Sequence, residues 1–76
     1  MLKELVEFMA RALVDNPDKV KVSDIEGEQT SVIELRVAKE DLGKVIGKQG
    51  RIAEAMRTLI RVKAAKKGTK ATLEIV

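Results

Sequence analysis

The chain has 76 residues, of which 45% are apolar, a formal net charge of +3, and neither cysteine nor histidine. A chain of this length forms one small domain. Its composition excludes disulfides, thiolate metal sites and the histidine on which most acid–base catalysts and metal sites depend. No apolar run approaches the roughly 18 residues that span a bilayer, and acids interrupt the start where a secretory signal would be apolar. We therefore expect a cytoplasmic protein that holds no cofactor or metal and is not an enzyme.

The first segment carries apolar residues at helical spacing with charged residues between them: Leu2, Leu5, Val6, Met9, Ala12 and Leu13. This pattern predicts an amphipathic helix that packs on a core. The helix is expected to end at Asn16-Pro17-Asp18, because proline disfavours the helical conformation in the residue before it. Phe8, the single aromatic residue, is expected to pack near Leu5 and Ala12.

Two stretches of alternating apolar residues follow and predict a β-hairpin. The first begins at Val20, where valines alternate with lysines, and the turn is expected at 27–29. The second, residues 33–37, is richer in apolar and β-branched residues, so we place it at the centre of a sheet. Ile25 is out of phase by one residue and predicts a bulge or the end of the first strand.

The remaining chain predicts two helices and a strand. Residues 39–46 carry acids in their first turn, where the backbone dipole of a helix is positive, and apolar residues on one face. A longer helix is predicted from Ile52 to about Lys67, with Gly68 as its C-terminal stop. Residues 71–76 alternate again and predict a closing strand. The predicted order is helix, strand, strand, helix, turn, helix, strand.

The charge is unevenly spread along the chain. Residues 1–38 hold five basic and eight acidic residues, a net charge of −3, whereas residues 39–76 hold ten and four, a net charge of +6. A basic half of this kind favours a polyanionic partner such as nucleic acid, although a solvated helix face also explains many lysines.

A glycine turn, Gly47-Lys48-Gln49-Gly50, lies between the two predicted helices of this basic half. Glycine has no side chain, so a sugar–phosphate backbone can approach the peptide groups closely, and the first N–H groups of the next helix favour an anion. Lys48 adds a positive charge, and Lys44 and Arg51 flank the turn. The spacing excludes the phosphate-binding loop and the dinucleotide fingerprint. A purely structural connection between helices remains the alternative.

The stretch Val45-Ile46-Gly47-Lys48-Gln49-Gly50-Arg51-Ile52 combines an aliphatic pair, a G-x-x-G loop and an aliphatic residue two positions later. With these residues the chain resembles a KH domain over essentially its whole length, and it is similar to the small single-KH, KhpA-like RNA-binding proteins of bacteria. The resemblance implies an α+β fold of type II, with the order α-β-β-α-α-β and a three-stranded mixed sheet whose helices pack on one face. It also implies one domain over 1–76, with the KH core at about 31–76.

The resemblance further implies binding of single-stranded RNA, because KH domains clamp about four nucleotides with this loop. The residues expected to bind are Lys44, Ile46, Gly47, Lys48, Gln49, Gly50, Arg51 and Ile52. The aliphatic strand Ile33-Leu35-Val37 is expected to help form the floor of a groove for bases. Implied roles are post-transcriptional regulation or RNA chaperoning, and implied partners are a second copy or a Jag-type KH protein.

Two other functions are alternatives to RNA binding, and an enzyme is the weaker of them. In a protein-interaction adaptor, the glycine turn is structural and the apolar helix faces dock a partner. An enzyme would need Asp, Glu, Lys or Ser to carry the chemistry, and no such constellation is visible. With one phenylalanine, the chain is not expected to stack bases on exposed aromatic residues, so a single KH site should bind weakly.

Overall fold

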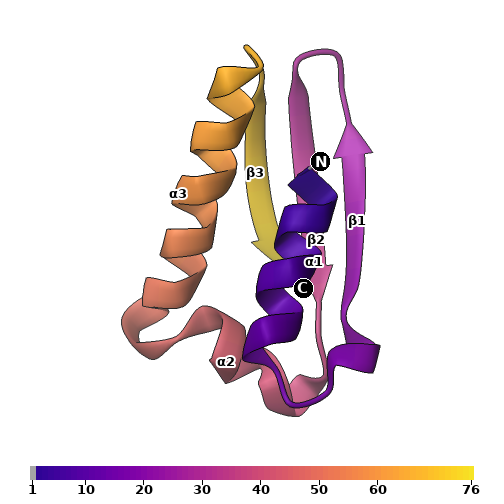
Figure 1. Ribbon diagram of the computed structural model, residues 1–76, viewed down its shortest axis with the longest axis vertical. Coiled ribbons are helices and arrows are strands. Elements are labelled where there is room, and N and C mark those ends of the chain that lie inside the picture. Colours follow the sequence, from indigo (N-terminus) through magenta and orange to yellow (C-terminus); the bar gives the residue numbers. More distant parts are fainter. Residues whose placement is uncertain (1) are drawn as a thin grey trace.

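The computed structural model describes residues 2–76, and the chain runs as helix, strand, strand, helix, helix, strand (Figure 1). The helices are α1 (Leu2–Leu13), α2 (Leu42–Ile46) and α3 (Arg51–Lys66), and the strands are β1 (Lys21–Glu26), β2 (Thr30–Arg36) and β3 (Lys70–Ile75). Short 3₁₀ turns lie at η1 (Pro17–Lys19), η2 (Lys39–Asp41) and η3 (Lys48–Gly50). This order confirms the predicted arrangement. Within residues 2–76, no helix has the length and apolarity needed to cross a membrane.

β2 is the central strand of a three-stranded sheet, as its composition predicted. It pairs antiparallel with β1 and parallel with β3, with Ile33 opposite Leu73 in the parallel pair. Both α1 and α3 lie on one face of this mixed sheet (Figure 1). Because β2 and β3 are parallel, the chain must return along the sheet between them, and α2, the glycine turn and α3 make this crossover.

The core fills the space between these helices and the covered face of the sheet. Ile33 and Leu35 of β2 are 0% exposed, as are Val6 of α1 and Ile60 of α3. Removing a side chain of this size from water contributes about 1.5–3 kcal/mol. The side chains that the alternating pattern of the strands and the helical spacing of α1 and α3 predicted to be buried therefore do lie in the core.

Two predictions for the first half of the chain need correction, one of them only in part. The pairing of β1 with β2 is unbroken from Lys21–Arg36 to Glu26–Ser31, so Ile25 marks no bulge, but it does lie next to the end of the strand, since β1 ends at Glu26. The Ile25 side chain lies on the uncovered face of the sheet and is 55% exposed. Phe8 is not packed against its neighbours but is 74% exposed. The buried stripe of α1 repeats every four residues from Leu2, and position 8 falls outside that stripe.

The last turn of α3 confirms the predicted stop at Gly68. Gly68 adopts a φ of 74°. Its N–H donates to the Ala65 carbonyl at 3.0 Å, and the Thr69 N–H donates to the Ala64 carbonyl at the same distance. These bonds satisfy carbonyls that the end of a helix otherwise leaves without partners.

Candidate nucleic-acid interface

The glycine turn between α2 and α3 has an unusual backbone. Gly47 (φ 78°, ψ 171°) ends α2, and Gln49 (φ 58°, ψ 25°) and Gly50 (φ 74°, ψ 14°) adopt left-handed conformations in succession. The Gly50 N–H donates to the Gly47 carbonyl at 3.1 Å, which closes the turn. α3 begins directly afterwards, so the turn presents the N-terminus of a 16-residue helix, where the backbone dipole favours an anion.

The two glycines of the turn are required for different reasons. A Cβ atom built on Gly47 would lie 2.6 Å from Cγ1 of Ile52, so only glycine lets the turn fold back over this side chain. A Cβ on Gly50 would meet nothing within 4 Å, and there the positive φ alone favours glycine. The space beside Gly50 is therefore open to a ligand.

Lys48, Gln49 and Arg51 are exposed around the turn. The Arg51 guanidinium donates to Oε1 of Gln49 at 3.2 Å. Among residues 2–76, the Lys48 ammonium has no acidic partner within salt-bridge distance. The turn thus offers one unpaired cation and one arginine engaged only by a neutral side chain.

Lys44 has a different environment from Lys48. Its ammonium lies 3.2 Å from Oδ2 of Asp15 and 3.9 Å from Oδ1 of Asp41, although the side chain is still 44% exposed. Lys44 is therefore drawn toward the segment that follows α1. A phosphate that binds Lys44 would have to compete with these carboxylates.

Asp41 joins that segment to the start of α2. It is 0% exposed. Its Oδ2 accepts hydrogen bonds from the backbone N–H and the side-chain amide of Asn16, both at 3.0 Å, and its Oδ1 accepts one from the Asp15 N–H at 3.3 Å. Burial alone would raise the pKa of Asp41, but these hydrogen bonds and the nearby Lys44 charge lower it below its ordinary value. No local sequence pattern points to this anchor, which joins residues 25 apart and places the helix that leads into the glycine turn.

The aliphatic part of the site differs from the prediction. Ile33 and Leu35 are fully buried and Val37 is 8% exposed, so this strand cannot contact bases. These side chains face the helices, because the covered face of the sheet is the core. Ile46 is 39% exposed beside the turn, whereas Ile52 is half-buried against the core. Of the aliphatic residues proposed for the groove, Ile46 is the most accessible.

Arg57 and Arg61 lie further along α3 and already have partners. The Arg57 side chain donates through Nε to the Leu73 carbonyl of β3 at 3.3 Å and through Nη1 to Glu54 at 3.1 Å. Nη2 of Arg61 lies 3.9 Å from the same glutamate. These contacts tie α3 to β3 and leave less free positive charge than the sequence alone indicates.

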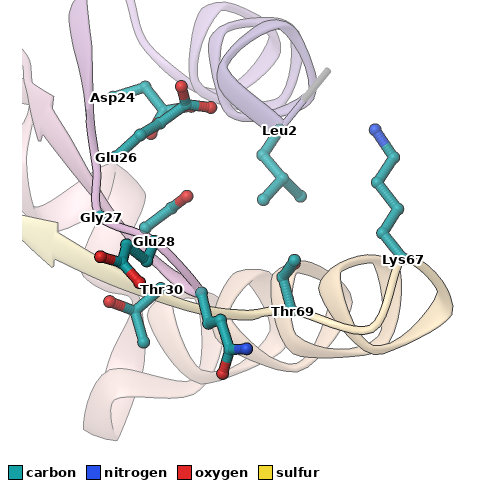
Figure 2. A pocket seen from close by; sticks show the side chains of 10 residues that line it. Leu2, Asp24, Glu26, Gly27, Glu28, Thr30, Lys67 and Thr69 are labelled. Atoms are coloured by element: carbon teal, nitrogen blue, oxygen red, sulfur yellow. The ribbon is translucent and has the colours of Figure 1, made fainter.

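A hollow of about 330 Å³ lies at the opposite end of the molecule from the glycine turn, beside the β1–β2 turn (Figures 1 and 2). Figure 2 shows Asp24 and Glu26 on one side of it and Lys67 on the other. With Glu28, acids outnumber bases in its lining. Such a surface repels phosphate, so this hollow is a poor candidate for nucleic acid. Among residues 2–76, no cluster of three or more possible metal ligands is present.

Comparison with known proteins decides the family. Residues 3–75 match the family model described as "KhpA/KhpB, KH domain". The chain belongs to the KhpA/KhpB family of KH domains. This assignment confirms the resemblance found in the signature around Gly47 and Gly50.

The KhpA/KhpB relatives are similar over almost their whole length. RNA-binding protein KhpA of Caldanaerobacter subterraneus subsp. tengcongensis is 58% identical over 73 residues, which cover 96% of this chain and 97% of the relative. RNA-binding protein KhpA of Aquifex aeolicus is 59% identical over 75 residues, which cover 99% of this chain and 95% of the relative. Both names describe RNA binding.

Solved structures extend the likeness beyond the KhpA/KhpB family. The structure of Era in complex with MgGDPNP and nucleotides 1506–1542 of 16S ribosomal RNA superposes with a TM-score of 0.66 at 26% identity. A structure of an Aquifex aeolicus Era variant bound to GDP and AlF4⁻ superposes with a TM-score of 0.64, also at 26% identity. The matches cover 97% of this chain but only 28% and 29% of the two Era chains.

Proposed function

We propose that this protein is a cytoplasmic RNA-binding protein that grips about four nucleotides of single-stranded RNA with the turn from Gly47 to Gly50. The observation that carries the proposal is the geometry of this turn. It is exposed, opens directly into the N-terminus of α3, and has free space where Gly50 lacks a side chain. The relatives named as RNA-binding proteins support the same ligand.

The proposed roles of the side chains follow from their environments. Lys48 contacts a phosphate as a free cation, and Arg51 can exchange its bond to Gln49 for another phosphate. Ile46 offers an exposed aliphatic surface to a base. Lys44 makes a weaker phosphate contact because Asp15 and Asp41 compete for its ammonium. Gly47 and Ile52 hold the shape of the turn.

A site for about four nucleotides binds weakly, so two sites acting together would raise the affinity of the assembly. We therefore propose that the protein acts in post-transcriptional regulation or as an RNA chaperone, as a homodimer or paired with a Jag-type KH protein. Sedimentation over micromolar concentrations tests the homodimer, and mixing with a purified Jag-type protein tests the heterodimer. A strict monomer in both experiments contradicts this part of the proposal.

The RNA proposal is tested with the double variant Lys48→Asp, Gln49→Asp, which puts two negative charges where phosphate should lie. The matched control is Lys67→Asp, Gln29→Asp, which makes the same two changes at exposed positions at the other end of the molecule. We expect the turn variant to lose binding of a short single-stranded RNA, with both the parent and the control weakening as salt rises. Equal binding by the two double variants would contradict the proposal.

The adaptor is the second candidate function, and exposed apolar residues on α1 and α3 favour it. Phe8 is 74% exposed and Leu59 is 51% exposed. An adaptor predicts that the charge changes at the turn leave function intact.

A further inference from the structure

Glu54 is the single acidic residue of α3 and lies in its first turn. It follows Arg51 by three residues, so the two side chains leave the helix on the same side. The Glu54 side chain is 63% exposed. A carboxylate in this position repels phosphate but accepts hydrogen bonds from the amino groups of bases. Its place beside the glycine turn therefore bears on which base is bound.

Two arginines hold the Glu54 carboxylate in place. Its Oε1 accepts a hydrogen bond from Nη1 of Arg57 at 3.1 Å, and its Oε2 lies 3.9 Å from Nη2 of Arg61. Arg57 is itself fixed, because its Nε donates to the Leu73 carbonyl of β3 at 3.3 Å. A carboxylate can accept about four hydrogen bonds, so acceptor positions on Glu54 remain free. The arginines thus orient an acceptor on the β3 side of α3.

The β3 side of α3 also offers room for RNA. α3 and β3 lie side by side (Figure 1), and a hollow of about 460 Å³ lies between the second half of α3 and the start of β3. Arg61 lines this hollow together with small side chains such as Ala65 and Ala71. Glu54 lies on α3 between the glycine turn and this hollow. RNA that leaves the turn on this side therefore passes Glu54 and reaches Arg61.

Glu54 and Arg61 together place an acceptor next to a donor. Cytosine presents its N4 amino group beside the ring acceptors N3 and O2, so the amino group can donate to the carboxylate while the guanidinium donates to N3 and O2. Uracil presents the O4 acceptor in place of the amino group, and O4 facing the carboxylate would leave two acceptors without a proton between them.

We propose that Glu54 and Arg61 recognise one base of the bound RNA and favour cytosine over uracil. Adenine has the same order of amino group and ring acceptor, so it is accepted as well. Arg61 can turn toward a base because its side chain is 61% exposed and it is held less closely than Arg57. This inference rests on the proposed function and adds a base preference to it.

The test compares single-stranded RNAs of about four nucleotides, namely oligo-C, oligo-U and an oligo-C whose bases lack the amino group. We expect the parent to bind oligo-C about tenfold more tightly than oligo-U, which is the discrimination that a good pairing of side chain and base supplies. Removal of the amino group should cost about fivefold, since N3 and O2 still meet Arg61.

Glu54→Gln should bind oligo-C and oligo-U with affinities within about twofold of each other, because its amide can turn an N–H toward O4 of uracil. Glu28→Gln is the matched control. It removes the same charge from an exposed position beside the β1–β2 turn and should keep the preference of the parent. Because Glu54 is largely exposed, its variant should fold, and circular dichroism checks this.

The inference is overturned if the parent binds the three RNAs equally, and the proposed function then still stands. It is also overturned if Glu54→Gln keeps the preference for oligo-C. A gain in affinity of Glu54→Gln for all three RNAs by one factor would show that the carboxylate acts only as a repulsive charge. The charge changes at Lys48 and Gln49 test the proposed function separately, since they should weaken oligo-C and oligo-U alike. If no RNA binds the parent, both proposals fail.

Discussion

Gly47 and Ile52 pack so closely that a single added carbon on the glycine would lie 2.6 Å from Cγ1 of the isoleucine. Gly47 also has a φ of 78° and a ψ of 171°, a conformation that is essentially restricted to glycine. The turn is thus held in place by the side chain beneath it.

This packing predicts that the two glycines of the turn differ in their tolerance of alanine. Gly47→Ala should lower the free energy of unfolding by about 2–4 kcal/mol, from backbone strain and overpacking together. Gly50→Ala should lower it by only about 1–2 kcal/mol, because its Cβ meets open space. Urea unfolding of the two variants measures the difference. Equal losses would mean that Ile52 does not restrict the turn.

Gln49 predicts a stabilising substitution. Its φ of 58° is uncommon for a residue with a side chain. Gln49→Gly should raise the free energy of unfolding by about 0.5–1 kcal/mol, because glycine adopts this conformation without strain. RNA binding should change little, since the variant adds no charge and keeps the backbone N–H. Calorimetry tests the predicted gain in stability, and RNA titration tests the unchanged affinity. A destabilised variant would contradict the prediction on stability.

Asp41 predicts a pH dependence of stability. The pKa of Asp41 lies below its ordinary value of 3.8 in the folded protein. Its carboxylate therefore stabilises the fold fully above that value, and the stabilisation is lost as the pH falls through the lower folded-state pKa. At pH 7, Asp41→Asn should lower Tm by about 5 °C, because the acceptor of three hydrogen bonds loses its charge.

Thermal unfolding at a series of pH values tests this dependence. The difference in Tm between the parent and Asp41→Asn should shrink below about pH 4 as the parent carboxylate takes up its proton. Comparing the two proteins removes the contribution of the other acids, which both share. A difference that stays constant down to pH 2 would show that the charge of Asp41 contributes nothing.

The contact between Lys44 and Asp15 predicts a variant with tighter RNA binding. The two side chains are 44% and 76% exposed, so the pair itself adds little stability. Asp15→Asn should free the Lys44 ammonium for phosphate and raise RNA affinity about two- to threefold. Asp18→Asn removes the same charge from an exposed residue nearby and serves as the control. Equal gains in the two variants would indicate a general charge effect.

The elements and the glycine turn were predictable because their signals are local. Helical and alternating patterns placed most of the buried side chains, and the fixed spacing of Gly47 and Gly50 identified the turn. The errors concern how the elements pack together. Which face of β2 the helices cover decides whether Ile33 can meet a base, and that depends on residues far along the chain. The anchor from Asp41 to Asn16 spans 25 residues and leaves no local pattern.

The hydrogen bond from Arg57 to the Leu73 carbonyl has a consequence for solubility. β3 is an edge strand, and an edge strand with free carbonyl groups can recruit a strand from another molecule and begin a growing sheet. A bulky guanidinium bonded to one of these carbonyls obstructs such pairing midway along the strand. The helix that begins at the glycine turn thus also protects the neighbouring sheet edge from aggregation.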